Sequence, residues 1–140
     1  MNIIYVCSES NPFIKTGGLG DVTFSLAKEC SKQGHNLAII LPFYGEIASN
    51  TKYSFTEVCR FSQQLDWRNA ETIIYKTVIE NVDFYFVSNV RYFFRPTPYG
   101  EKDDDERFAF FSRASITAIQ SLDLSPDIII FFSFFFINLL

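Results

Sequence analysis

The sequence predicts an α/β domain built on a parallel β-sheet. An apolar, β-branched and aromatic run from Ile3 to Cys7 has the character of a strand buried on both faces. A glycine-containing loop and an amphipathic segment follow it, and a second buried run, Leu37 to Leu41, ends at Pro42. This strand-loop-helix-strand order is typical of the start of a parallel sheet with a right-handed crossover. A chain of 140 residues favours one domain.

The composition excludes several classes of protein. With 48% hydrophobic and 20% charged residues, the chain can bury a core and is not a disordered linker. A net charge of −4 without any basic block argues against nucleic-acid partners and anionic membrane surfaces. The cysteines, at positions 7, 30 and 59, match no CxxC spacing, which argues against a metal site and favours a reducing compartment.

The first residues indicate a strand and not a signal or transit peptide, because no basic flank precedes the apolar run. No stretch reaches the roughly 18 apolar residues of a spanning helix. We therefore expect a cytoplasmic protein with no membrane association, or a plastid protein if the source is a plant.

The first part of the chain predicts a strand, a loop from Ser8 to Gly20 and a helix from about Asp21 to Gln33. Apolar residues of the helix recur on one face, and Gly34 suits the position after its last turn. The remaining segments alternate between strand, loop and helix character. We expect strands over 53–61, 71–79 and 82–87, some of them antiparallel, a tight turn at 80–81, a loop over 92–100, a helix from about 103–105 that ends before Pro126, and a strand from Ile128 to Ile130.

The segment Lys15-Thr-Gly17-Gly18-Leu19-Gly20-Asp21 is the most informative part of the sequence. It lies between the first strand and the first helix, at the edge of a parallel sheet where ligands bind. Glycines allow the backbone to approach a ligand closely, and the N–H groups of a helix start attract anions. Lys15 adds a positive charge suited to a phosphate oxygen. The loop can therefore hold a diphosphate.

Pattern alone leaves a second interpretation open, in which the glycines only relieve strain in a tight turn. The dinucleotide fingerprint Gly-x-Gly-x-x-Gly fails because position 23 is Thr, and no acidic residue ends the second strand. These two departures disfavour a dehydrogenase. The Walker pattern fails because Lys15 precedes the glycines.

The run from Glu9 to Val22, Glu-Ser-Asn-Pro-Phe-Ile-Lys-Thr-Gly-Gly-Leu-Gly-Asp-Val, closely resembles the N-terminal signature of bacterial glycogen synthases and plant starch synthases, the family-5 glycosyltransferases. The resemblance continues in order to about residue 129. It includes Gln33-Gly34-His35, Leu41-Pro42-Phe43-Tyr44, a loop similar to the family's sugar-side loop from Tyr92 to Gly100, the helix Glu106 to Ala114, and Ser125-Pro126-Asp127-Ile128-Ile129.

The resemblance implies the N-terminal, Rossmann-like domain of a GT-B enzyme. Such an enzyme transfers glucose from ADP-glucose to the non-reducing end of an α-1,4-glucan with retention of configuration, and the resemblance implies no cofactor or metal. It would place Lys15 on the phosphates, and Gly17 and Gly18 close to the phosphates or glucose. Asp21 would contact sugar hydroxyls or hold the loop, and Tyr99 would lie on the sugar or acceptor side.

Each of these assignments has a structural alternative. Asp21 can instead serve as the helix N-cap or a first-turn acid, because carboxylates stabilise that end of a helix. Tyr99 can simply pack its loop. Glu9 can be a substrate contact or, equally, an acceptor that fixes the glycine loop.

The sequence departs from the family after Ile129. Where the family has a stretch of the type His-x-His-Asp-Trp-His, residues 130–140 are almost entirely apolar. We expect a family domain over 1–129 and an aberrant hydrophobic tail over 130–140, produced by a frameshift or early stop, with a real strand or anchor as the alternative. His35 is the only histidine, and its place after the first helix predicts a structural or solvated role. The resemblance also implies a second domain that is absent, so no catalytic set is complete. We expect an inactive fragment, or alternatively a non-catalytic nucleotide- or glucan-binding module.

Overall fold

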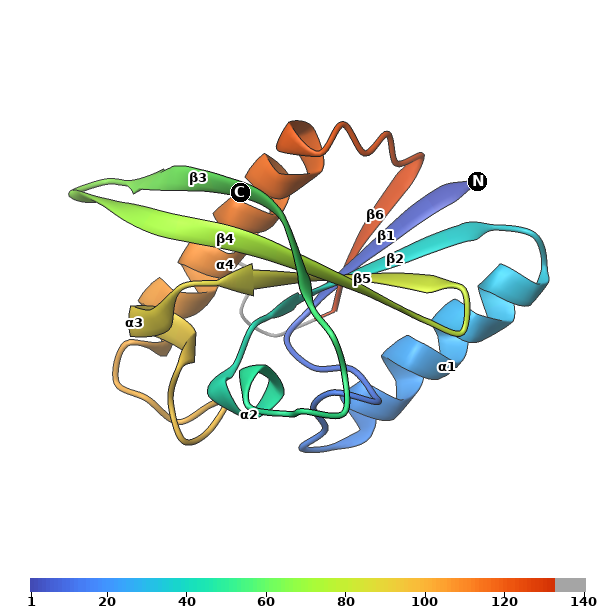
Figure 1. Cartoon of the computed structure of the whole chain (residues 1–140), viewed down its shortest axis with the longest axis horizontal. Coiled ribbons are helices and arrows are strands. Elements are labelled where there is room, and N and C mark those ends of the chain that lie inside the picture. Colours follow the sequence, from blue (N-terminus) through green and yellow to red (C-terminus); the bar gives the residue numbers. More distant parts are fainter. Residues whose placement is uncertain (133–140) are drawn as a thin grey trace.

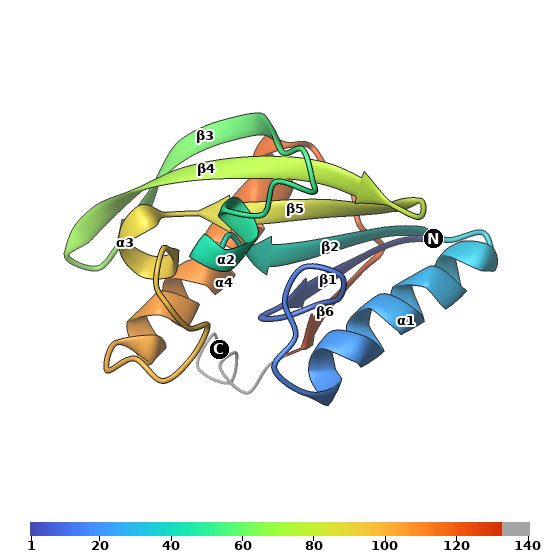
Figure 2. The same ribbon diagram turned by 60° about the horizontal axis from the view of Figure 1, so that its bottom comes forward.

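The computed structural model describes residues 1–132 and contains one six-stranded sheet with helices on both faces (Figures 1 and 2). The strand order is β3-β4-β5-β2-β1-β6. Strands β5, β2, β1 and β6 are parallel to one another, while β4 is antiparallel to both of its neighbours. The elements in chain order are β1 (Asn2–Cys7), α1 (Gly18–Lys32), β2 (Asn36–Pro42), α2 (Gly45–Ala48), β3 (Thr56–Leu65), β4 (Arg68–Ile79), β5 (Val82–Ser88), α3 (Val90–Phe93), α4 (Asp104–Ser121) and β6 (Ile128–Phe132).

The predicted β1-α1-β2 unit is confirmed. The two strands pair in parallel from Asn2 with Asn36 to Val6 with Ile40. The predicted start of the helix at Asp21 is wrong, because α1 begins at Gly18. Glycine has a low intrinsic preference for helix, but contacts outside the helix determine the residue at which α1 begins. The backbone N–H of Gly20 donates to the Glu9 side chain at 3.1 Å, which fixes the first turn.

The predicted strands in the middle of the chain form an antiparallel meander, β3-β4-β5. Glu80 and Asn81 both have positive φ, 48° and 64°, as a two-residue hairpin turn requires. The β3-β4 hairpin extends further than predicted, with pairing up to Leu65 and Arg68. Its outer part is polar, so the apolar pattern did not reveal it.

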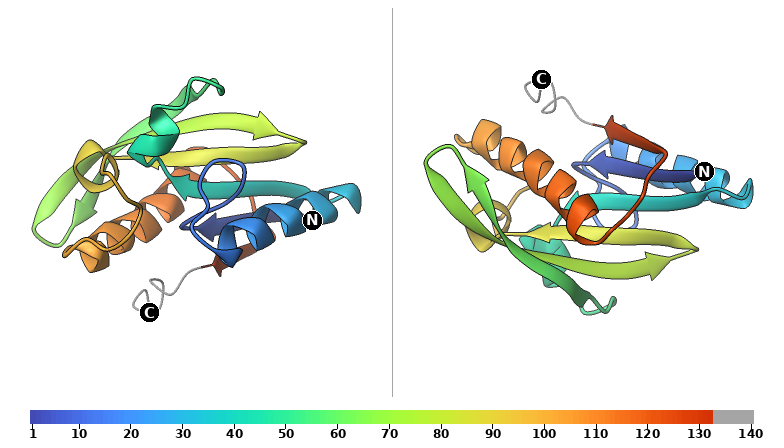
Figure 3. Two further views of the ribbon diagram at one scale, coloured as in Figure 1. Left: turned by 90° about the horizontal axis from the view of Figure 1, so that it is seen from below. Right: turned by 90° about the horizontal axis from the view of Figure 1, so that it is seen from above.

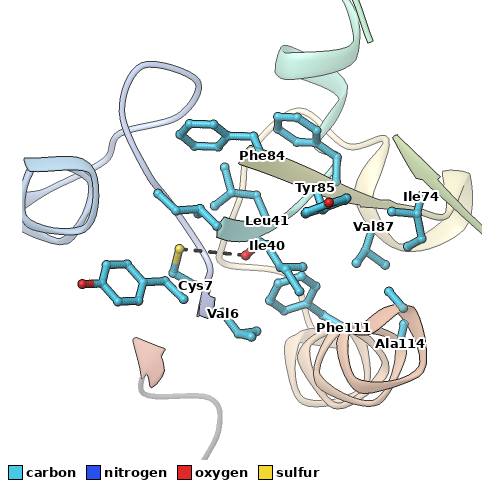
Figure 4. Close-up of a cluster of buried hydrophobic side chains, with 14 of the residues drawn as sticks. Val6, Cys7, Ile40, Leu41, Ile74, Phe84, Tyr85, Val87, Phe111 and Ala114 are labelled. Carbon is cyan, nitrogen blue, oxygen red and sulfur yellow. Dashed lines mark hydrogen bonds between the residues drawn. The ribbon is translucent and has the colours of Figure 1, made fainter. Parts of the chain in front are cut away.

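Helix α1 covers one face of the sheet and helix α4 covers the other (Figure 3). On one face, the rings of Phe13 and Phe24 lie 4.9 and 5.7 Å from that of Phe84. On the other face, Phe111 and Ala114 of α4 pack beneath Val87 (Figure 4). The aromatic residues of β5 therefore form the centre of the core.

Two short helices were not predicted, because four residues show no periodicity. Helix α3 includes Tyr92 and Phe93, which we expected in a loop. The Asn89 side chain caps it by accepting from the Tyr92 N–H at 3.1 Å. At the other end of the chain, β6 pairs with β1 through Phe132, so the first three residues of the predicted tail belong to the sheet. Residues 133–140 lie outside the described residues, and the tail assignment stays a prediction. Within residues 1–132, no helix is both long and apolar enough to cross a membrane.

Candidate functional site

The glycine loop follows the carboxyl end of β1, at the edge of the sheet where β2 and β5 also end (Figure 2). This is the edge at which parallel α/β sheets bind ligands. The loop folds back on itself, because the N–H of Asn11 donates to the Gly20 carbonyl at 2.9 Å. The structure thus brings the predicted residues Lys15, Gly17, Gly18 and Asp21 together around the start of α1.

Lys15 and Asp21 form an ion pair across this helix start. Their Nζ and Oδ2 atoms are 2.6 Å apart, and each side chain is about half exposed. The Asn11 amide also donates to Asp21. The hydrogen bond from Lys15 holds the pKa of Asp21 below its ordinary value. The N-cap is Gly17 and Asp21 lies in the first turn, so the N-cap position predicted as one alternative for Asp21 is wrong and the other, a first-turn acid, is confirmed.

The three glycines of the loop differ in what surrounds them. A Cβ built on Gly17 or Gly18 would meet nothing within 4 Å. A Cβ on Gly20 would lie 3.2 Å from the Ile14 carbonyl oxygen and 3.2 Å from the Lys15 Cβ. A side chain at position 20 would therefore require its neighbours to shift by a few tenths of an ångström, while Gly17 and Gly18 border open space that a ligand can enter.

Glu9 lies under this loop and is buried. Its carboxylate accepts hydrogen bonds from the Thr16 hydroxyl, from the Gly20 N–H at 3.1 Å and from the Tyr99 hydroxyl at 3.1 Å. Its carbonyl oxygen accepts from Thr23 at 3.2 Å. These contacts match the loop-fixing alternative for Glu9. Because the carboxylate occupies the Gly20 N–H, it leaves the preceding amides of the helix start for a ligand.

Tyr99 connects the loop of residues 92–100 to the glycine loop. Its hydroxyl donates to Ser8 Oγ at 2.7 Å as well as to Glu9, and its ring lies 5.8 Å from that of Phe108. Burial raises the pKa of Tyr99 well above its ordinary value, so the hydroxyl stays protonated as a donor. These are the packing contacts of the structural alternative, and a sugar contact of Tyr99 stays a prediction.

Arg107 is a structural residue of the site that the sequence did not reveal. Its side chain is fully buried and lies over the rings of Phe93 and Phe108. The guanidinium donates to the carbonyl of Tyr92 at 2.7 Å, to that of Pro98 at 3.2 Å, and to the Asp104 carboxylate at 2.7 Å. Arg107 thereby holds both ends of the 92–100 loop. The available signal was an arginine placed next to the apolar stripe of α4.

Other candidate features lie away from the glycine loop. His35 is in the turn before β2, where its Nδ1 is 3.1 Å from the amino terminus. A hollow of about 320 Å³ opens at the opposite edge of the sheet and is lined in part by Asn2, Asn36 and Asp83, which stand at the amino ends of their strands. The buried Cys7 thiol has a raised pKa because of desolvation, which makes it a poor nucleophile.

Comparison with known proteins agrees with this arrangement. A family model described as the starch synthase catalytic domain matches residues 2–131. Glycogen synthases of Streptococcus pneumoniae strains CGSP14 and G54 are 44% identical over 129 residues, which are 92% of this chain and 27% of each relative. The fold matches the catalytic domain of starch synthase IV from Arabidopsis thaliana bound to ADP and acarbose, with a TM-score of 0.83, 30% identity and coverage of 91% of this chain and 27% of that one.

The chain thus spans about a quarter of the length of these relatives. The match runs through the glycine loop, the 92–100 loop and all six strands. It confirms the resemblance on which the glycosyltransferase fold was predicted. The chain belongs to the starch synthase catalytic domain family.

Proposed function

We propose that this chain is the nucleotide-sugar-binding N-terminal part of a glycogen synthase, an enzyme that transfers glucose from ADP-glucose to the non-reducing end of an α-1,4-glucan. The observation that carries the proposal is the position of Lys15, whose ammonium group is held 2.6 Å from Asp21 in the first turn of α1, the helix that begins at Gly18. The family membership of the chain supports the same function.

The chemistry of the transfer fits this geometry. When glucose leaves ADP-glucose, negative charge develops on the departing diphosphate. A lysine and the amides of a helix start stabilise charge of that sign. Asp21 holds the Lys15 side chain in place. Because the pair is half exposed, a phosphate oxygen can bind the Lys15 ammonium group beside the Asp21 carboxylate, or in place of it, at little cost. Asp21 is then available to accept hydrogen bonds from sugar hydroxyls.

The same site supports a division of labour with the rest of the enzyme. The glycine loop lies at an exposed edge of the sheet. Residues 1–132 would therefore cover only one side of a bound nucleotide sugar. The second wall would come from the remaining length that the relatives possess. The starch synthase IV structure, bound to ADP and acarbose, is consistent with a nucleotide and a glucan lying close to such a domain. We place the reaction in the cytoplasm.

Titration of the isotope-labelled chain with ADP-glucose, followed by amide NMR shifts, tests this proposal. We expect shifts at Gly17, Gly18 and Leu19 that saturate with ligand. One charge-assisted hydrogen bond is worth about 1.5–3 kcal/mol, so Lys15→Ala should weaken binding roughly 10- to 100-fold. Lys32→Ala, at the C-terminal end of α1 and far from its glycine-loop end, is the matched control and should not change the affinity. Equal affinity in both variants would remove Lys15 from the site.

A further inference from the structure

Asn11 completes the polar cluster at the start of α1. Its side-chain amide donates to Oδ1 of Asp21, while the ammonium group of Lys15 lies 2.6 Å from Oδ2 of the same carboxylate. An ionised carboxylate only accepts hydrogen bonds, so the NH₂ group of Asn11 is the part of the amide that faces it. The two oxygens of Asp21 therefore have different partners, one neutral and one charged.

We propose that Asn11 is a positioning residue for the glucose of the bound donor and that it acts through Asp21. The proposal rests on the proposed function, because it concerns the same nucleotide-sugar site. It adds one residue to that site and gives each oxygen of Asp21 its own task. Oδ1 stays bound to Asn11, and Oδ2 passes from Lys15 to a sugar hydroxyl.

The backbone of Asn11 is held at a fixed place beside the helix start. Its N–H donates to the Gly20 carbonyl at 2.9 Å, and its own carbonyl accepts from the Ser10 hydroxyl at 2.9 Å. Gly20 immediately precedes Asp21 in the chain, so a backbone hydrogen bond lies next to the one between the side chains. The short Asn11 side chain is thus directed at Asp21 before any ligand binds, which lowers the entropic cost of using that carboxylate.

Lys15 alone is a weaker anchor for Asp21. The ion pair joins a long, flexible side chain to a carboxylate, and both are about half exposed, so water and salt weaken it. When a phosphate oxygen binds the Lys15 ammonium group, the ion pair loosens further. Asn11 carries no charge, so a phosphate attracts it far less and it keeps its hydrogen bond to Oδ1. The carboxylate then keeps its orientation, and Oδ2 can accept from a sugar hydroxyl.

The charge state of Asp21 agrees with this role. The hydrogen bond from Lys15 does most to lower the pKa of Asp21, desolvation opposes it, and the hydrogen bond from Asn11 lowers the pKa further. Asp21 is therefore ionised at neutral pH and acts as an acceptor whether or not Lys15 stays beside it.

The test compares ADP-glucose with ADP, which has the same diphosphate but no glucose. Both are titrated by NMR against the whole chain and its variants near neutral pH. Asn11→Ala leaves a ligand-binding carboxylate to be ordered on binding, so we expect the affinity for ADP-glucose to fall roughly 2- to 10-fold while the affinity for ADP stays within about twofold. A residue that only stabilised the loop would change both affinities alike.

Two further variants control for side-chain size and for the loss of an asparagine. Asn11→Asp keeps the size of the side chain but is ionised and cannot donate, so it should also lose affinity for ADP-glucose. Asn36→Ala removes another asparagine whose amide donates to a side chain, that of Asn2 at 2.8 Å, at the opposite edge of the sheet, and should change neither affinity. Equal losses for ADP and ADP-glucose in Asn11→Ala, or full ADP-glucose affinity in Asn11→Asp, would overturn the proposal.

A carboxyl titration of Asp21 in the ligand-free chain separates this proposal from the proposed function. Asn11→Ala should raise the pKa of Asp21, because it removes a hydrogen bond to the ionised form, and an unchanged pKa would overturn the proposal. Lys15-dependent binding of both ligands, with the same ratio of affinities in Asn11→Ala as in the original chain, would reject the role of Asn11 alone. A raised pKa without Lys15-dependent binding in the original chain would reject the proposed function and, with it, the role of Asn11 toward a sugar.

Discussion

Removal of the Glu9 carboxylate should destabilise the glycine loop, because three hydrogen bonds depend on it. Glu9→Ala leaves the Gly20 N–H, which is buried, without its acceptor, and an unsatisfied buried donor costs about 1–3 kcal/mol. The Tyr99 hydroxyl keeps Ser8 as a partner but loses its hydrogen bond to a carboxylate. Thr16 is exposed, so its hydroxyl can turn to water. Together with the small cavity, these terms give a loss of about 3 kcal/mol in the free energy of unfolding.

Urea unfolding followed by circular dichroism at pH 7 measures this loss. Glu9→Gln is the matched variant, because its amide oxygen can still accept from the Gly20 N–H while its NH₂ group faces hydroxyls that can accept. We expect it to lose about 1 kcal/mol, well below the loss in Glu9→Ala. A Glu9→Ala chain within 0.5 kcal/mol of the original, on the scale of an ordinary surface change, would refute the role of Glu9 in fixing the loop.

Three further predictions follow from the same structure. Residues 1–140 and 1–129, expressed separately, should transfer no labelled glucose to glycogen, because loss of one cleft wall forfeits positioning worth about 7–11 kcal/mol of barrier; turnover by either purified chain would contradict this. Gly20→Ala should cost about 1 kcal/mol of stability, since its Cβ would crowd the loop, while Gly17→Ala stays within about 0.5 kcal/mol in the same urea assay; equal effects would refute the packing argument. The hydrogen bond from Arg95 lowers the pKa of Asp103, so this pair should add up to about 1 kcal/mol to the free energy of unfolding above the unfolded pKa near 4, and this contribution should be lost as the pH falls further. Asp103→Asn should remove that part of the pH dependence. A stability difference between the variant and the original chain that stays constant between pH 3 and pH 7 would show that the ion pair is not its source.

The sequence was sufficient for the features that depend on local pattern. Two buried runs around a glycine loop and an amphipathic helix determined the parallel β1-α1-β2 unit. The Glu80-Asn81 pair between two apolar runs likewise determined a hairpin turn. Because the carboxyl end of β1 leads directly into the glycine loop, the position of Lys15 at the ligand-binding edge followed from the order of elements alone.

What the sequence could not reveal depends on contacts between distant segments. The helix start at Gly18 relies on Glu9, eleven positions before Gly20. The outer part of the β3-β4 hairpin is polar and is held by backbone pairing, so it has no apolar signature. Arg107 resembles a surface residue of an amphipathic helix, and only the fold reveals that the loop carbonyls surround it.

We infer that the glycine loop of this chain holds the donor of a glycogen synthase reaction. The most direct measurement is glucose transfer from labelled ADP-glucose to glycogen by a hybrid enzyme, in which residues 2–129 replace the matching region of the Streptococcus pneumoniae relative. We predict an active hybrid whose kcat/KM falls roughly 10- to 100-fold with Lys15→Ala and is unchanged with Lys32→Ala. A folded hybrid that is inactive, or whose turnover is indifferent to Lys15→Ala, would contradict the claim.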